Sequence, residues 1–140
     1  MIAPAFGIGL PMARQLWMYA LAAINHRLWH EAEPILEALE AVSEIEDDVA
    51  LARAFMGWRK ERSLECVRQL ADGAANGQPM ATLLLGYVHA ESGLLTPALD
   101  CLLRAGQYGD AVVQTLTPLL ETRVSEAMQS ASTPQSTGHA

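Results

Sequence analysis

The chain has 140 residues, of which 51% are hydrophobic, so it can bury one good core and we expect a single domain. Its formal net charge of -7 leaves no broad positive field to hold phosphates, and we expect no nucleic-acid partner. Cys66 and Cys101 lie inside helical patterns rather than in a short disulfide framework, which favours free thiols in a reducing compartment.

The N-terminal stretch MIAPAFGIGLP, residues 1–11, is apolar but interrupted by Pro and Gly. A secretory signal begins with positive charge, whereas the first basic residue here is Arg14, in the middle of the apolar region. The uncharged run 15–25 is also shorter than the roughly 20 residues that cross a bilayer. We therefore expect a cytoplasmic protein without stable membrane insertion, whose residues 1–11 form an irregular arm.

Beyond the arm, apolar residues recur at three- and four-residue spacing, and no strand-like alternation persists. The sequence therefore predicts an all-α fold. Asp47 and Asp48 favour a helix N-terminus, and Thr96 before Pro97 is typical of an N-cap. Residues 129–140 lack apolar periodicity and are expected to be a disordered tail. The predicted helices cover residues 12–26, 30–42, 47–59, 62–73, 79–91, 96–106 and 108–128.

Three segments, HEAEPILEAL (30–39), LECVRQLADG (64–73) and TPALDCLLRA (96–105), align when Ala32, Cys66 and Ala98 share a register. Their separations of 34 and 32 residues are close to the tetratricopeptide period of about 34. We therefore expect three degenerate tetratricopeptide-like hairpins and a C-terminal capping helix, in one domain over residues 1–128.

Small residues recur where the two helices of each hairpin would cross, which lets helix axes approach to about 8 to 10 Å. The register predicts the packing pairs Ala20 with Ala32, Ala54 with Cys66, and Gly86 with Ala98.

Residues that could support catalysis or bind a metal are sparse. His26 and His30 are four apart, but a predicted turn separates them, so we do not expect a zinc site. His89 takes a repeat position that packs between helices, and neither cysteine has a neighbouring His in the sequence. The GIG at residues 7–9 follows no predicted strand and is not a dinucleotide motif. We expect neither an enzyme nor a cofactor.

The register instead predicts a partner-binding groove, because the first helix of each tetratricopeptide hairpin lines a concave surface. We expect these side chains to be largely exposed in the empty protein, with an apolar, aromatic centre and charged ends. Trp29, in contrast, is expected in the core. The predicted groove residues are Arg14, Trp17, Leu21, Ile24, Asp48, Leu51, Phe55, Trp58, Arg59, Met80, Leu83, Tyr87 and Glu91.

A groove of this kind is typical of binding an amphipathic helix. The alternative is that the last helix or the N-terminal arm of the protein itself fills the groove. If the groove is open, the empty protein should self-associate or bind a hydrophobic dye, because large apolar patches seldom stay exposed.

The segments HEAEPILEAL, ALARAFMGWRKERSLECVRQLADG and LLLGYVHAESG together resemble the tetratricopeptide-like chaperones of bacterial type III secretion. The chain is most similar to the family that keeps the needle subunit monomeric in the cytosol, over about residues 14–106. The resemblance implies that the amphipathic C-terminal helix of a needle subunit binds in the groove. It also implies a smaller helical co-chaperone near the first repeat.

Two other functions stay open at this point. One is another tetratricopeptide-like secretion protein, either a translocator chaperone or a protein of the plant-pathogen secretion clusters. The other is a structural protein–protein adaptor.

Overall fold

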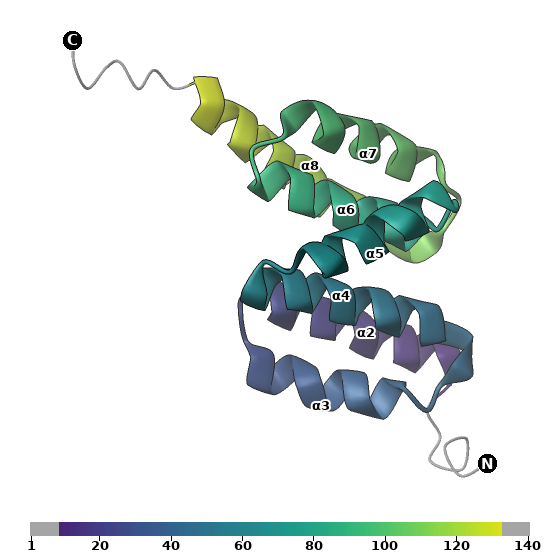
Figure 1. The fold of residues 1–140 in the computed structure, drawn as a ribbon. Helices are drawn as coiled ribbons and strands as arrows, with labels where there is room; N and C mark the ends of the chain where they lie inside the picture. The colour runs from purple at the N-terminus through teal and green to yellow at the C-terminus, as the bar shows by residue number, and fades with distance from the viewer. Residues whose placement is uncertain (1–8, 133–140) are drawn as a thin grey trace. The chain divides into compact units, whose positions relative to one another are not determined.

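A computed structural model describes residues 9–132, and within that range it contains seven α-helices, one 3₁₀ turn and no strand (Figure 1). The all-α prediction is therefore confirmed. None of these helices is long and apolar enough to cross a membrane. The elements are α2 (Leu10–Asn25), α3 (Trp29–Leu39), η1 (Ser43–Ile45), α4 (Glu46–Glu61), α5 (Leu64–Ala75), α6 (Pro79–Glu91), α7 (Leu95–Gln107) and α8 (Ala111–Ser132).

Most helix ends lie within three residues of their predicted positions, and α4 begins with an acidic first turn as expected. Thr96 was wrongly assigned as an N-cap: α7 begins at Leu95, Leu94 holds the cap position, and no side chain caps the helix. The predicted tail begins too early, because α8 continues to Ser132. The prediction that the irregular arm extends to residue 11 is wrong, because α2 begins at Leu10. Residues 1–8 of the predicted arm lie outside the described residues.

The chain divides into two compact units, up to Leu70 and from Ala71. That these units form one domain stays a prediction. The division falls inside α5. Unit 1 contains α2, α3, η1 and α4, and unit 2 contains α6, α7 and α8, so each is described by itself.

In unit 1, α2 packs against α3 and α4, and α3 also contacts α4. Two hydrogen bonds fix the direction of α2 relative to α4. The Trp17 indole N–H donates to the carbonyl of Asp48 at 2.8 Å, and the Arg59 guanidinium donates to the carbonyl of Asn25 at 3.0 Å. The earlier residue of α2, Trp17, bonds to the start of α4, and the later residue, Asn25, bonds to its end, so α2 and α4 run parallel.

In unit 2, α6 is the central helix, and α7 and α8 pack against it and against each other. An unbroken run of α6 from Met80 to Val88 is buried, as expected for a helix that is apolar on all sides. Gly86 faces both neighbours. A Cβ added there would lie 2.8 Å from Cδ2 of Leu120 and 3.0 Å from Cβ of Cys101. The absence of a side chain at Gly86 lets three helices meet.

In two of the hairpins small residues meet, but not in the predicted pairs. The nearest α7 side chain to Gly86 is Cys101 rather than Ala98, and the Sγ of Cys66 faces Gly57 rather than Ala54, 2.6 Å from a Cβ built there. In each contact one partner lies three residues further along the chain than predicted: Cys101 instead of Ala98, and Gly57 instead of Ala54. These two predicted pairs are wrong by nearly one helical turn, because neighbouring turns also carry small residues. The pairing of Ala20 with Ala32 stays a prediction. Ala20, Ala32, Ala54 and Ala98 are all buried nonetheless.

Three of the turns between helices have the same backbone geometry. In each, one residue is left-handed and the next donates its N–H to the carbonyl five residues before it, as in a Schellman helix end. The left-handed residues are Arg27 (φ 62°), Gly77 (φ 81°) and Gly93 (φ 79°). The bonds join Leu28 to Ala23 (2.8 Å), Gln78 to Gly73 (3.0 Å) and Leu94 to His89 (2.9 Å).

The turn between α4 and α5 differs from these three. Arg62 is left-handed (φ 55°), and its N–H donates to Trp58 at 2.7 Å; the Ser63 hydroxyl then accepts a bond from the N–H of Cys66 at 3.2 Å. Ser63 thereby caps α5, which allows the helix to begin within two residues of the turn.

Substitution of Gly86 tests the three-helix contact. Gly86→Ala should lower the free energy of unfolding by about 1 to 3 kcal/mol, since the added methyl overpacks against Leu120 and Cys101. Gly106→Ala in α7 is the control, because nothing lies within 4 Å of a Cβ there. That change should stabilise by up to about 1 kcal/mol through helix propensity. Equal effects of the two substitutions in urea unfolding would show that Gly86 is not a close contact.

The turns give a second, paired stability test. Arg27→Gly should stabilise the protein by about 0.5 to 1 kcal/mol, because glycine adopts the left-handed conformation without a Cβ clash. Gly93→Ala, in the same turn geometry, should destabilise it by about 1 kcal/mol. Thermal melts of both variants would check this, and a loss of stability in Arg27→Gly would contradict it.

Candidate functional site

Ten of the predicted groove residues are buried, with exposed fractions between 0 and 9%. They are Trp17, Leu21, Ile24, Leu51, Phe55, Trp58, Arg59, Met80, Leu83 and Tyr87. Arg14 is exposed, and Asp48 and Glu91 are half-buried. The expectation that this set is exposed in the empty protein is therefore wrong. The set also falls on both units, with Met80, Leu83, Tyr87 and Glu91 in unit 2.

Contacts inside unit 1 account for several of these positions. Trp17 bridges α2 to the first turn of α4, and the rings of Phe55 and Trp58 stack with centroids 6.2 Å apart. Arg59 is 7% exposed and its guanidinium reaches the carbonyl of Asn25, the last residue of α2. A cation there is favoured by the partial negative charge of the helix end. The bonds made by Trp17 and Arg59 hold α2 on α4.

In unit 2, Glu91 on α6 forms a charged pair with Arg123 on α8. Arg123 lies 3.6 Å from the Glu91 carboxylate. Burial raises the pKa of Tyr87 to about 12, although the charge of Arg123 opposes that rise. The Tyr87 phenol therefore stays protonated at neutral pH, and its side chain acts as packing.

Trp29 is less buried than the other two tryptophans, which reverses the prediction for this residue. It is the first residue of α3 and half-buried, whereas Trp17 and Trp58 are 2% and 4% exposed. The Lys60 ammonium lies 5.9 Å from the centre of the Trp29 ring, within the range of a cation–π contact.

The residues considered for metal binding or catalysis are not brought together. His26 and His30 are exposed, on either side of the turn between α2 and α3. Across residues 9–132, no group of three or more His, Cys, Asp or Glu side chains could hold a metal ion. Burial raises the pKa of the Cys101 thiol, which disfavours the reactive thiolate.

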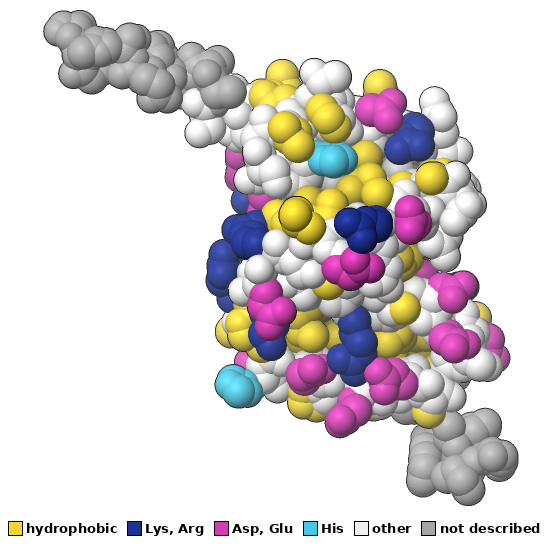
Figure 2. Space-filling model, in the orientation of Figure 1, with side chains coloured by type: hydrophobic (Ala, Val, Ile, Leu, Met, Phe, Trp, Pro, Cys, Tyr) yellow, Lys and Arg dark blue, Asp and Glu magenta, His cyan; other side chains and the backbone are white. Residues whose placement is uncertain are grey.

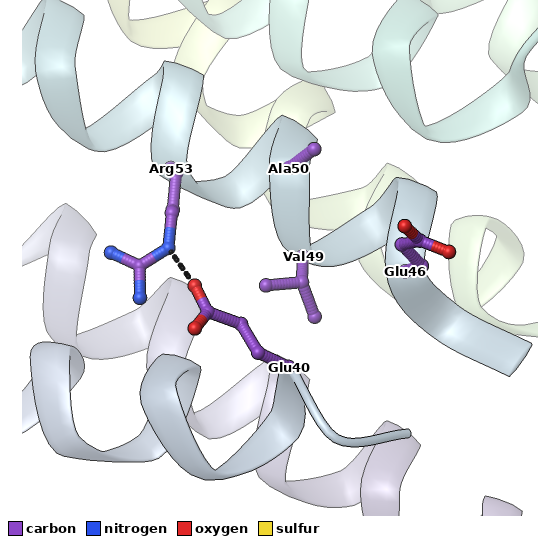
Figure 3. A pocket seen from close by; sticks show the side chains of 5 residues that line it. All are labelled: Glu40, Glu46, Val49, Ala50 and Arg53. Carbon is purple, nitrogen blue, oxygen red and sulfur yellow. Dashed lines mark hydrogen bonds and ion pairs between the residues drawn. The ribbon is translucent and has the colours of Figure 1, made fainter. Parts of the chain in front are cut away.

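A shallow depression of about 270 Å³ lies between α3 and α4 in unit 1, lined by Glu40, Glu46, Val49, Ala50 and Arg53 (Figure 3). Arg53 closes one side by donating to Glu40 at 2.7 Å and to Glu33 at 2.8 Å. Burial lowers the pKa of Arg53, but these two hydrogen bonds outweigh it and raise the pKa above its ordinary value. The guanidinium is thus a permanently charged link between α3 and α4.

A second depression, of about 330 Å³, lies between the C-terminal parts of α6 and α8. Small side chains dominate its lining, and Glu91, its one charged group, is already paired with Arg123. Neither depression combines a nucleophile, a base and a closed cavity, so neither supports a catalytic step.

The surface that sequence reasoning missed is the outer face of α2, which we define as Met12, Gln15, Tyr19 and Ala22. All four side chains are exposed, Met12 by 56% and Tyr19 by 66%. Their spacing of three, four and three residues places them along one side of the helix. The sequence contained this signal, because Arg14 is the only charged residue in α2. An exposed helix face normally carries charged or strongly polar residues.

Comparison of the chain with models of protein families, with curated proteins and with solved structures finds no match.

Protonation of His89 gives a testable pH dependence. Its partial burial in α6 lowers its pKa below the ordinary value of 6.5, so the unfolded chain takes up a proton before the folded chain does. Stability should therefore be complete above pH 6.5 and fall as the pH drops below that value. His89→Gln should reduce this slope in urea unfolding series. Identical slopes for the two proteins would contradict the assignment.

Proposed function

We propose that this protein is a chaperone that binds an amphipathic helix of a partner, in the manner of the needle-subunit chaperones of type III secretion. The observation that carries the proposal is the exposed, nearly uncharged outer face of α2. The predicted groove does not carry it, since ten of its residues are already buried.

The outer face of α2 has the properties of a helix-docking surface. Met12 and Tyr19 are seven residues apart, and both are more than half exposed. Gln15, which lies between them, is uncharged, and Ala22, one turn after Tyr19, is small. A partner helix binds such a surface through apolar side chains at i, i+3 or i+4 and i+7. Tyr and Met are also over-represented at protein interfaces, since they supply large or adaptable contact area.

A tetratricopeptide-like arrangement is the second part of the proposal. Helical hairpins succeed each other along the chain, and the left-handed residues Arg27 and Gly93 each stand five residues before a buried alanine, Ala32 or Ala98. Arg62 stands four residues before Cys66, so the middle hairpin differs by one residue. These equivalences support a degenerate repeat.

The choice of a needle subunit as partner rests on the resemblance of HEAEPILEAL and LLLGYVHAESG to the needle-chaperone family. An acidic, helical protein of 140 residues with an exposed apolar helix face agrees with a role in covering the amphipathic helix of a polymerising subunit. In this proposal the chaperone acts in the cytoplasm, and a small co-chaperone is a further partner.

Co-expression with a candidate needle subunit, followed by mass determination of the purified complex, tests the proposal directly. A one-to-one complex, or a three-component complex that includes a co-chaperone, would support it. If the protein purifies alone and the needle subunit still polymerises at its usual rate, the chaperone function fails.

A substitution in the outer face of α2 tests the docking surface. Tyr19→Asp should weaken binding of the needle subunit by at least about tenfold, because it places a charge within an apolar contact. The melting temperature should change little, since Tyr19 is 66% exposed. Leu103→Asp is the matched control, because Leu103 is 68% exposed but lies on α7 in unit 2. Titration calorimetry showing equal losses for both variants would argue against this surface.

A further inference from the structure

The net negative charge of the protein is concentrated in one stretch of unit 1. Residues 28–52 contain eight Asp and Glu residues and no Lys or Arg. All nine Lys and Arg residues of the chain therefore lie outside this stretch. Figure 2 shows acidic side chains gathered over the surface where Figure 1 draws α3.

The fold places four acidic residues of this stretch and the main basic cluster at opposite ends of unit 1. The acidic end consists of the exposed Glu40, Glu44, Glu46 and Asp47, around η1 and the first turn of α4. Arg14, exposed in the N-terminal part of α2, is also towards this end, so it is mixed but carries an excess of negative charge. Glu40 and Glu46 line the same depression, so the end of α3 and the start of α4 are close together.

The basic end consists of the exposed Arg27, Lys60 and Arg62. Lys60 reaches over Trp29 at the start of α3, and Arg62 lies 4.3 Å from the centre of the Trp58 ring. Glu31 and Glu61 are also near this end, so it is mixed but carries an excess of positive charge.

Helix α2 connects the two ends. Its residue Trp17 bonds to Asp48 in the first turn of α4, and its last residue, Asn25, bonds to Arg59 in the last turn of α4. The N-terminal part of the outer face of α2 therefore lies towards the acidic end, and its C-terminal part lies towards the basic end.

We infer that a helix bound on the outer face of α2 lies antiparallel to α2, with a basic C-terminal end at the acidic end of unit 1. This inference rests on the proposed function. Helices favour acidic residues in the first turn and basic residues in the last turn, because these oppose the partial charges of the helix ends. A partner helix of that kind finds opposite charges at both ends in the antiparallel direction and like charges at both ends in the parallel one. The apolar contact fixes where the helix binds, and the charges fix its direction.

The direction can be read by NMR on the intact, isotope-labelled protein. The probe is a synthetic amphipathic peptide of about 16 residues, the length of α2, with leucines at i, i+3 and i+7, glutamates in its first turn and lysines in its last. A nitroxide is attached at one peptide end or the other. With the nitroxide on the lysine end, amides of residues 43–48 should broaden. With it on the glutamate end, amides of residues 26–28 and 60–62 should broaden.

Three results are decisive. The pattern above supports the antiparallel direction. If peptide binding shifts the amides of Met12, Gln15 and Tyr19 but the nitroxide broadens both ends alike or in the reverse order, the inference fails while the docking surface stands. If no amide of the outer face shifts, the docking surface fails as well.

Charge neutralisation supplies an independent measure. The double variant Glu44→Gln, Asp47→Asn should weaken peptide binding about threefold to tenfold at low salt, which is the contribution of about two exposed ion pairs. The matched control Asp72→Asn, Glu121→Gln removes the same charge from exposed residues outside the acidic end and should bind as wild type. Equal affinity of the two double variants would overturn the inference.

Discussion

The left-handed turn residues determine which parts of the chain can meet. Arg27 and Gly93 each end a helix and return the chain within three residues, so α2 and α3, and likewise α6 and α7, are antiparallel neighbours. Because α3 runs antiparallel to α2, the chain is back near the N-terminal half of α2 when it reaches η1, and α4 then runs parallel to α2. The acidic residues around η1 and the start of α4, and the basic residues at the end of α4, are therefore at opposite ends of unit 1.

The helices could be predicted from the sequence because apolar spacing and acidic first turns are local signals. The register in which neighbouring helices contact each other could not be predicted from these signals. A register that pairs Gly86 with Ala98 differs from the observed contact with Cys101 by three residues, and both partners are small enough for close approach. Thr96 was misassigned for a related reason. Threonine followed by proline suits a cap, yet proline is equally tolerated within the first turn, so the helix could begin at Leu95.

The candidate site was harder to predict, because an aromatic residue facing a neighbouring helix and one facing a partner have the same sequence pattern. Trp17, Phe55 and Trp58 were assigned to an open groove, but contacts such as the Trp17 bond to Asp48 hold them inside the protein. The outer face of α2 was detectable by a different criterion. Once Trp17, Leu21 and Ile24 face inwards, Met12, Gln15 and Tyr19 must face outwards, and the absence of charge among them becomes the unusual feature.

An apolar face and a charged rim have different physical roles in such a surface. Exposed ion pairs contribute little to affinity, about 0 to 1 kcal/mol each, whereas buried aromatic and aliphatic anchors dominate it. The acidic and basic ends of unit 1 therefore cannot by themselves hold a partner helix. They can distinguish two directions of binding that bury the same apolar area, because reversing the helix exchanges attraction for repulsion at both ends. A protein whose charge is segregated in this way can select the direction of a helix that the outer face of α2 would otherwise bind in either direction.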